Sequence, residues 1–421
     1  MFGLLVALAI GIGIGCLAGC AHDFRSIYKS GEEANNPSVM PQGLVIGVVH
    51  ARNSIWHEFE DNEDYRLAVD AANAVRNLST EQKVAQLFFV TPESLVSGYT
   101  DETVTEAGEA TRQALNERPV GGIVYFKQNL IDTVQTARML ANTQEYALEA
   151  CGIPILLDVD EEGGTVSRVG GNAGFGVENV GNMSAVGATQ DAAYAAEVAL
   201  TIGSYLHNLG FTADFAPVAD IANNPNSDTM VWRSFGSDPE LVSSMVAAQV
   251  ESFRSQRIIC CVKHFPGIGG AEGDSHVGAI YSEKTADEMY DVELAPFRAA
   301  IEAGVPMVMV GHLSCPNITG NDLPASVSPA IMQDLLRDRL GFDGVIVTDS
   351  LGMGAIVERY GYDRVAVEVF LAGSDALLMP ADFETAYQGM LAAVESGEIS
   401  QERLDASVYR IVLMKLANER R

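Results

Sequence analysis

Short apolar runs alternate with longer segments of helical periodicity along most of this chain. A run that is apolar at every position predicts a strand buried on both faces, and such strands occur in parallel sheets. The intervening segments, of which 192–209, 241–255 and 330–340 are the clearest, predict helices. The apolar runs lie at residues 87–90, 123–126, 155–160, 215–218, 259–264, 307–312, 345–349 and 376–379.

Eight strands separated by helices predict an α/β fold, and we expect a single (β/α)8 barrel of the TIM type. A doubly wound open sheet has the same alternation, so periodicity alone does not separate the two architectures. The barrel is predicted as one catalytic domain over residues 76–421. Its first helix is expected just after Ser79, which has capping-box spacing to Gln82 ahead of an apolar-periodic run.

Polar residues at the ends of the apolar runs favour the barrel. Barrel enzymes place their chemistry at the carboxyl ends of the strands, whereas a purely structural core does not need charges there. The residues at these positions are Asp158, Asp160, Lys263, His264, His312 and Asp349. We therefore expect these strand ends to form a catalytic face, which we call the mouth of the barrel.

The amino-terminal segment predicts export. Residues 1–19 contain no charged side chain, and they are followed by Cys20 in the sequence LAGC. A short apolar segment closed by small residues is typical of a signal peptide. The LAGC ending resembles the bacterial lipobox, which implies lipidation of Cys20 and a membrane-anchored lipoprotein outside the cytoplasm. Residues 20–75 are then a tether and pre-domain segment. The alternative is an uncleaved apolar anchor, for which 19 glycine-rich residues are short.

Composition and charge remove several classes of function. The 421 residues are 48% hydrophobic and 19% charged, which excludes wholesale disorder. With 26 lysines and arginines against 56 aspartates and glutamates, the formal charge is −30, and such a surface repels the phosphates of nucleic acids. The 6 cysteines show no zinc-ligand spacing, so neither a disulfide scaffold nor a zinc module is expected.

A glycine-rich loop follows the apolar run at 259–264. It begins at Lys263 and His264 and continues to Asp274 and His276. The loop lacks the GxxxxGKS/T pattern, and its lysine precedes the glycines, so it is not expected to bind nucleotide phosphates. An aspartate two residues before a histidine can orient and tune the imidazole for proton transfer, which favours a mobile catalytic loop. A surface loop with an incidental histidine is the alternative that these residues alone leave open.

Two acidic features could also carry chemistry. Asp349 stands at a strand end, where a fixed and ionised carboxylate can serve as a nucleophile. An aspartate followed by Ser350 could equally cap a helix. The turn at 158–164 holds four carboxylates, which could bind a hard metal ion, grip sugar hydroxyls or lie in solvent.

Taken together, these segments resemble glycoside hydrolase family 3, and within it the bacterial β-N-acetylhexosaminidases. The resemblance runs from about residue 78 to residue 415. The matching segments are IPILLDVDEEGGTVSR at 153–168, FAPVAD at 215–220, RSFG at 233–236, KHFPG at 263–267, DSH at 274–276, PASVS at 324–328 and GFDGVIVTDSLGM at 341–353. Each segment is short, but their order and spacing are highly specific.

The resemblance implies a role for each matching residue. Asp349 corresponds to the nucleophile, His276 to the acid/base and Asp274 to the partner of that histidine. The positions that hold the non-reducing-end sugar are occupied by Asp160, Arg168, Arg233, Lys263 and His264. A carboxylate nucleophile with a proton donor across the scissile bond is what a retaining glycosidase requires. Neither a metal nor a cofactor is expected.

The loop departs from the family pattern KHFPGHGDT, because Ile268, Gly270 and Ala271 replace its second histidine, its aspartate and its threonine. The spacing to Asp274 and His276 is unchanged, so we expect the pair to survive with fewer polar supports. The resemblance implies a monomeric β-N-acetylglucosaminidase that acts on glycans containing terminal GlcNAc, with peptidoglycan fragments as the natural substrates. A phosphorylase of the same family and an inactive sugar-binding lipoprotein are the alternatives.

Overall fold

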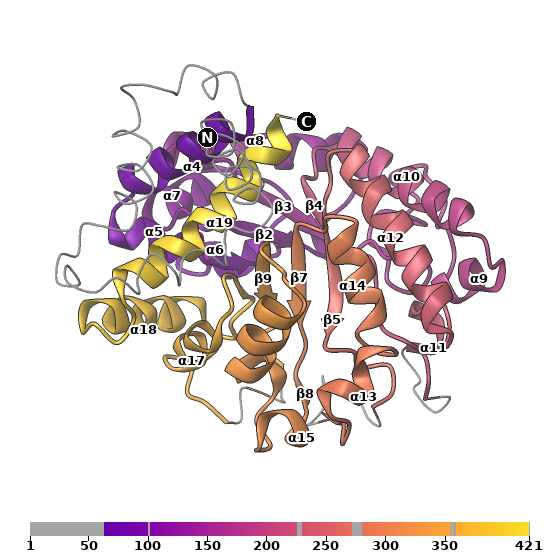
Figure 1. Cartoon of the computed structure of the whole chain (residues 1–421). Helices are drawn as coiled ribbons and strands as arrows, with labels where there is room; N and C mark the ends of the chain where they lie inside the picture. The colour runs from indigo at the N-terminus through magenta and orange to yellow at the C-terminus, as the bar shows by residue number, and fades with distance from the viewer. Residues whose placement is uncertain are drawn as a thin grey trace, which may run out of the picture.

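The computed structural model describes residues 63–99, 102–224, 230–271, 280–353, 356 and 359–420. Parallel strands form a central barrel, and helices surround it (Figure 1). The expected signal at 1–19, Cys20, Asp274 and His276 lie outside the described residues. Within the described part, no helix combines the length and the apolar character needed to cross a membrane.

Hydrogen bonds join eight strands into the ring that the sequence predicts. One run of neighbours is β10-β1-β2-β3 and the other is β4-β5-β7-β9, with every pairing parallel. The amide of Thr212 donates to the carbonyl of Leu157 at 3.0 Å, which links β3 to β4, and the amide of Thr348 donates to the carbonyl of Ala376 at 3.2 Å, which links β9 to β10. The strands are β1 (Phe88–Val90), β2 (Gly122–Tyr125), β3 (Leu156–Val159), β4 (Ala213–Asp214), β5 (Ile259–Phe265), β7 (Met307–Val310), β9 (Val345–Thr348) and β10 (Leu377–Leu378).

The fourth strand begins earlier than the apolar run at 215–218 predicts. Its paired residues are Ala213 and Asp214, which lie opposite Ile259 and Cys260 of β5. Pairing beyond them is reduced to an isolated bridge between Val218 and Lys263, because Pro217 has no amide hydrogen to give to a ladder. The run is extended as predicted, but its ladder is short.

Helices cover the outside of the ring. Ser79 caps α5 and forms the predicted capping box with Gln82. The segment predicted as a helix at 330–340 is helical over Ala330–Arg339, but its hydrogen bonds follow the wider π pattern. The longer α-helices are α7 (Glu109–Glu117), α8 (Thr133–Cys151), α10 (Ala192–Leu209), α12 (Pro239–Ser255), α14 (Ala295–Glu302), α17 (Val365–Ala372), α18 (Phe383–Glu395) and α19 (Gln401–Glu419). Shorter ones are α5 (Thr80–Gln86), α6 (Pro92–Val96), α9 (Met183–Ala188), α11 (Met230–Arg233), α13 (Ala286–Tyr290) and α15 (Pro316–Thr319).

One further helix, α4 (Glu63–Asn77), precedes the barrel. Most of it falls in the tether and pre-domain segment that the sequence predicts at 20–75. It packs along α19, with Ala71 and Val75 fully buried and Arg420 paired with Asp70 at the far end (Figure 1). Residues 63–75 therefore belong to the folded body, at the end of the barrel opposite the mouth.

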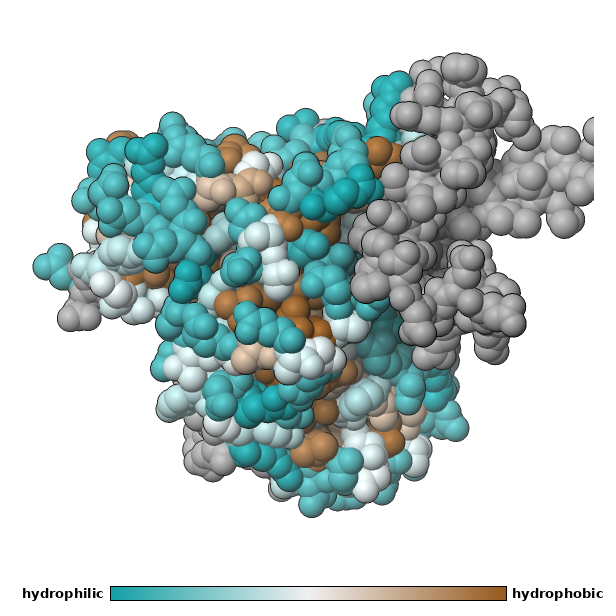
Figure 2. All heavy atoms as spheres, turned by 90° about the vertical axis from the view of Figure 1, so that its left-hand side faces the viewer, coloured by the Kyte–Doolittle hydropathy of each residue, from teal (hydrophilic) through white to brown (hydrophobic). Residues whose placement is uncertain are grey.

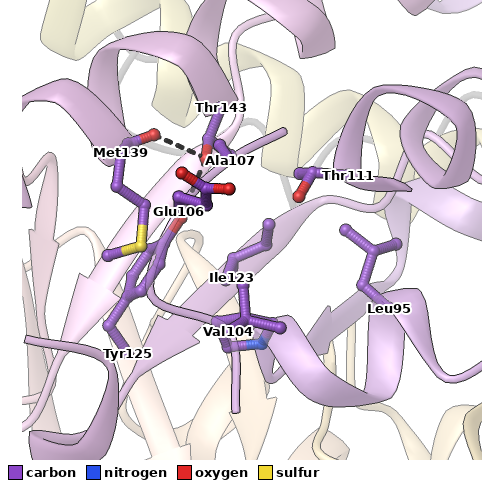
Figure 3. A pocket seen from close by; sticks show the side chains of 10 residues that line it. Leu95, Val104, Glu106, Ala107, Thr111, Ile123, Tyr125, Met139 and Thr143 are labelled. Atoms are coloured by element: carbon purple, nitrogen blue, oxygen red, sulfur yellow. Dashed lines mark hydrogen bonds between the residues drawn. The ribbon is translucent and has the colours of Figure 1, made fainter. Parts of the chain in front are cut away.

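The core leaves little empty space behind the strands. A cavity of about 10 Å³ lies between β2 and the helices α6 and α8 (Figure 3). The hydroxyl of Tyr125 reaches Thr143 Oγ1 beside it at 3.1 Å. A space of this size holds one water at most, so it is no ligand site. On the side shown in Figure 2 the described surface is largely hydrophilic, with apolar residues gathered near the middle of the face.

Candidate active site

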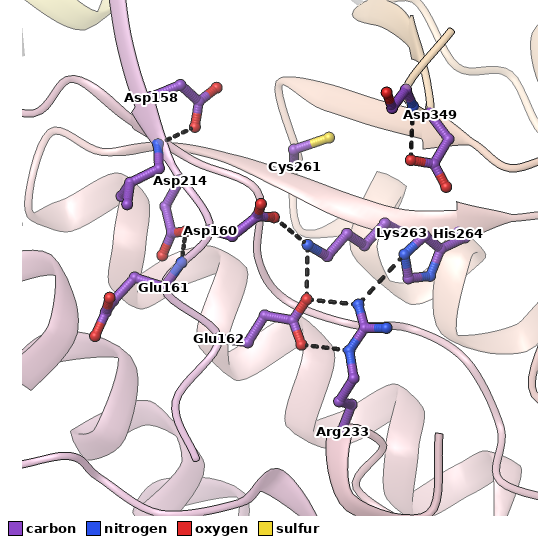
Figure 4. A network of polar contacts seen from close by, with 12 residues as sticks. Asp158, Asp160, Glu161, Glu162, Asp214, Arg233, Cys261, Lys263, His264 and Asp349 are labelled. Atoms are coloured by element: carbon purple, nitrogen blue, oxygen red, sulfur yellow. Dashed lines mark hydrogen bonds and ion pairs between the residues drawn. The ribbon is translucent and has the colours of Figure 1, made fainter. Parts of the chain in front are cut away.

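The strand ends bring four predicted site residues into one network of polar contacts (Figure 4). Asp160 follows β3, Lys263 and His264 belong to β5, and Arg233 is the last residue of α11. The carboxyl ends of β3 and β5 lie on the same side of the barrel because its strands are parallel, and α11 follows β4, which lies between them. Residues separated by more than 100 positions along the chain thus meet in the mouth.

Glu162, which sequence reasoning did not single out, is the centre of this network. Its carboxylate receives two hydrogen bonds from Arg233, each of 2.7 Å, and an ion pair from Lys263 Nζ at 2.7 Å. Lys263 Nζ also lies 2.7 Å from Asp160 Oδ1. The side chains of Glu162 and Lys263 are only 2% and 3% exposed, so these charges are held away from water.

The charges in the network stabilise one another. Burial alone would raise the pKa of Glu162, but Lys263 and Arg233 outweigh burial and hold that pKa well below the usual range of a glutamate. Burial would likewise lower the pKa of Lys263, yet Asp160 and Glu162 raise it above the ordinary lysine value. Glu162 and Lys263 are therefore both charged at neutral pH. They present fixed donors and acceptors to a polar ligand.

Asp220 orients the ring of His264. Its Nδ1 lies 2.7 Å from Asp220 Oδ2, and the same carboxylate accepts from the backbone amides of His264 at 3.2 Å and Ile268 at 2.7 Å. With Nδ1–H donating to Asp220, Nε2 is left to accept from Arg233 Nη2, which is 3.4 Å away. Asp220 thus joins the network to the first residues of the glycine-rich loop.

Asp349 faces the same mouth from β9. Its amide donates to the carbonyl of Val310 at 2.8 Å, and its Oδ1 accepts from the amide of Ser350 at 2.7 Å. Burial would raise the pKa of Asp349, but His264, His312, the amide of Ser350 and the ammonium of Lys263 together outweigh burial and lower that pKa below the ordinary aspartate value. The carboxylate is therefore ionised at neutral pH, as a nucleophile must be.

Arg168 is positioned through Glu161, which the sequence left as part of an acidic turn. The Glu161 carboxylate accepts from the amides of Arg168 at 2.6 Å, Val169 at 2.9 Å and Gly170 at 2.8 Å, and from the Tyr205 hydroxyl at 2.8 Å. These hydrogen bonds fix the backbone conformation of the loop that follows β3. The Arg168 side chain then points toward Asp160, with Nη2 at 3.7 Å from Oδ2.

The acidic turn is accordingly a set of buried acceptors. Glu161 and Glu162 are both buried and hydrogen-bonded. Asp158 is also buried, accepts from the amide of Val159 at 2.8 Å and lies apart from the network (Figure 4). Burial raises the pKa of Asp158 well above its usual range. Among the residues described, no group of three His, Cys, Asp or Glu side chains is arranged to hold a metal ion.

The first residues of the glycine-rich loop pack closely against residues 221–224. A Cβ on Gly269 would lie 2.0 Å from the carbonyl oxygen of Ile221, so only glycine fits there. Asn224 Nδ2 donates to the carbonyl of Ala271 at 2.9 Å, and Ile268 packs against the core. Asp274 and His276 come directly after this part of the loop in the sequence, outside the described residues.

Comparison with known proteins identifies the family to which this chain is similar. Residues 79–414 match a family described as "Glycosyl hydrolase family 3 N terminal domain". Beta-hexosaminidase A of Pseudoalteromonas piscicida is 34% identical over 327 residues, which are 72% of this chain and 54% of that protein. This chain thus spans about half the length of that relative.

Two solved structures are similar over most of the chain. A glycoside hydrolase family 3 beta-N-acetylglucosaminidase from Paenibacillus sp. str. FPU-7 superposes with a TM-score of 0.75 and 39% identity, covering 81% of this chain and 63% of its own. A beta-glucoside phosphorylase, BglX, bound to 2FGlc superposes with a TM-score of 0.73 and 25% identity, covering 85% of this chain and 62% of its own.

Proposed function

This chain belongs to glycosyl hydrolase family 3, and from that premise we propose that it is a retaining β-N-acetylglucosaminidase. It would remove terminal β-linked N-acetylglucosamine from glycans. The observation that carries the proposal is the ionised Asp349 at the end of β9, in the same mouth as the network of Asp160, Glu162, Lys263 and Arg233 (Figure 4). The relatives named for hexosaminidase activity support the choice of sugar.

The reaction proceeds in two steps. A carboxylate oxygen of Asp349 attacks the anomeric carbon, the bond to the leaving oxygen breaks, and His276 donates its proton to that oxygen. The products are a glycosyl ester of Asp349 and the released aglycone. Water then attacks the same carbon while His276 takes its proton, and the ester bond to Asp349 breaks. Two inversions at one carbon give a sugar with retained configuration.

The buried network provides binding. The side chain of Asp160 is 20% exposed, so its oxygens can accept from sugar hydroxyls while Lys263 holds it in place. Arg168 is held by Glu161 and can donate from the side of β3. Fixed charged groups of this kind hold a sugar without having to reorganise when it binds.

Two further assignments complete the proposal. Asp274 orients His276 on the glycine-rich loop, and the neutral imidazole adds no negative charge beside Asp349. Residues 1–19 direct export and Cys20 carries the lipid, so that the enzyme stands outside the cytoplasm as a membrane-anchored monomer. Peptidoglycan fragments with terminal GlcNAc are the substrates available there.

Phosphorolysis is a second candidate reaction, favoured by the likeness to a beta-glucoside phosphorylase and by the histidine that takes the place of a carboxylic acid/base. A histidine does not repel a phosphate that approaches the glycosyl-enzyme, whereas a carboxylate would. The product would then be a sugar 1-phosphate.

One experiment separates these possibilities. Residues 21–421 would be incubated with an aryl N-acetyl-β-glucosaminide, with and without phosphate, beside Asp349→Asn and the exposed control Asp343→Asn. We expect free GlcNAc without phosphate, no turnover by Asp349→Asn and full turnover by Asp343→Asn. Product only in phosphate would assign a phosphorylase. Glycan binding without any product would leave a sugar-binding protein, and an active Asp349→Asn would remove Asp349 from the mechanism.

A second variant tests the acid/base. His276→Ala should lose far more activity on natural glycans, which need protonation of the leaving oxygen, than on aryl glycosides with good leaving groups. Small and equal losses on both kinds of substrate would argue against His276 as the acid.

A further inference from the structure

His312 uses both ring nitrogens to connect two segments behind the nucleophile. It follows β7, the strand between β5 and β9, and it is 1% exposed. Its Nε2 lies 2.9 Å from the carbonyl oxygen of Ser350, and its Nδ1 lies 2.7 Å from Ser326 Oγ. Ser326 belongs to the PASVS segment at 324–328, to which the mechanism above assigns no role.

The direction of these hydrogen bonds follows from the groups involved. A carbonyl oxygen can only accept, so Nε2 of His312 carries the hydrogen and donates it to Ser350. In a neutral ring Nδ1 must then accept, and the hydroxyl of Ser326 is its donor. The Ser350 carbonyl therefore requires this tautomer of His312, and Ser326 holds the ring from its other nitrogen.

Ser350 is fixed at both of its backbone polar groups. Its carbonyl accepts from Nε2 of His312 at 2.9 Å and from the amide of Met353 at 3.2 Å, while its amide donates to Asp349 Oδ1 at 2.7 Å. The residues on either side are fixed as well, because Asp349 donates to Val310 and Leu351 donates to Leu378, each at 2.8 Å. The amide that faces the Asp349 carboxylate thus has one orientation, and the Ser350 carbonyl would lose its side-chain contact without His312.

We propose that His312, held by Ser326 at its other ring nitrogen, is a positioning residue for the nucleophile. By holding Ser350 it keeps the amide of that residue on Oδ1 of Asp349 and leaves Oδ2 as the oxygen that attacks the sugar. This inference rests on the proposed function, in which Asp349 forms the glycosyl-enzyme. His312 itself does not touch the sugar in this scheme.

A matched pair of substitutions isolates the contact to Ser350. The amide nitrogen of glutamine falls close to the place of a histidine Nε2, whereas that of asparagine falls close to Nδ1. His312→Gln can therefore still donate to Ser350, and His312→Asn cannot. We expect His312→Asn to lose about 100-fold in kcat, as misplacement of a reacting group by about an ångström does, with KM changed less than about threefold. His312→Gln should lose less than about tenfold.

The choice of substrate distinguishes a misplaced nucleophile from a lost acid. A nucleophile out of place slows the first step for every leaving group, so His312→Asn should lose activity alike on dinitrophenyl and phenyl N-acetyl-β-glucosaminides. A defect confined to the phenyl glycoside would assign His312 to leaving-group protonation and overturn the proposal. Equal losses in the asparagine and glutamine variants, or wild-type kcat in folded His312→Asn, would overturn it too.

Ser326→Ala keeps the proposal testable if His312→Asn does not fold. Without the hydroxyl, Nδ1 of His312 loses its partner and the ring is held less firmly against Ser350, so we expect kcat to fall about five- to tenfold with an unchanged KM. If Ser326→Ala folds and His312→Asn does not, a wild-type kcat in Ser326→Ala overturns the proposal. Wild-type protein that turns over neither glycoside would instead contradict the proposed function, so the two failures are distinguishable.

Discussion

Glu162 and Arg233 are joined by two parallel hydrogen bonds of 2.7 Å each, with side chains that are 2% and 14% exposed. This bidentate pairing fixes both the position and the plane of the guanidinium. Because Lys263 shares the same carboxylate, one buried glutamate sets the direction of two cations in the mouth.

Glu162→Gln should reduce both stability and substrate binding. The amide keeps the shape of the side chain but leaves the charges of Lys263 and Arg233 less compensated, which should cost about 3 kcal/mol in the free energy of unfolding. We expect KM to rise by about tenfold or more as the two cations lose their orientation. Urea unfolding and steady-state kinetics measure the two effects. Glu178→Gln, an exposed substitution on the same loop, should change stability by less than about 0.5 kcal/mol. A Glu162→Gln variant with wild-type KM would contradict the orienting role.

The same substitution should change the dependence of stability on pH. The folded-state pKa of Glu162 is lowered from the ordinary 4.5, so its contribution to stability is present above that value and is lost as the pH falls through the folded pKa. The stability difference between wild type and Glu162→Gln should therefore be constant near neutrality and shrink below about pH 4.5. Urea midpoints at pH 7, 5.5, 4 and 3 test this. A constant difference down to pH 3 would mean that the ion pairs add little.

Gly269→Ala should disturb the catalytic loop. The new Cβ would lie 2.0 Å from the Ile221 carbonyl oxygen, which is backbone and cannot move aside cheaply. We expect kcat/KM to fall by about 100-fold, because displacement of the loop carries Asp274 and His276 with it. Gly98→Ala is the control, since nothing lies within 4 Å of a Cβ there. Near-normal kinetics in Gly269→Ala would show that the loop start does not set the position of the acid/base.

Lys415 should make stability rise on the alkaline side of neutrality. Burial lowers its pKa to about 7, and its ammonium nitrogen lies 2.9 Å from Gln86 Oε1. A lysine with a lowered folded-state pKa opposes folding most below pH 7, and this opposition fades between pH 7 and the ordinary value of 10.5. Wild type should therefore gain stability from pH 7 to 10 relative to Lys415→Met. The exposed substitution Lys127→Met should follow wild type across this range. Parallel curves for wild type and Lys415→Met would contradict the lowered pKa.

Sequence patterns predicted the elements of the barrel well because each rests on local information. The capping box at Ser79 and Gln82 involves one turn of chain, and the apolar run at 307–312 requires only neighbouring residues. The helix at 330–340 was placed by the same means. Its π hydrogen bonding could not be predicted, because apolar spacing is much the same in either helix.

Glu161, Glu162 and Asp220 could not have been assigned in that way. The partners of Glu162 lie 71 and 101 positions away, since 233 − 162 = 71 and 263 − 162 = 101. A carboxylate in a loop has the same local pattern whether it meets solvent or a buried arginine. The resemblance to a family transferred the roles of Asp160 and Arg233, but not those of the groups that support them.

Helix α4 approaches α19 on the closed side of the barrel, and Arg420 pairs with Asp70 there (Figure 1). Residues 63 and 420 therefore lie on the side of the folded body away from Asp349 and the polar network of Glu162, Lys263 and Arg233. A fusion partner, a purification tag or a link to a solid support can be added beyond either residue without blocking access of a substrate to the mouth.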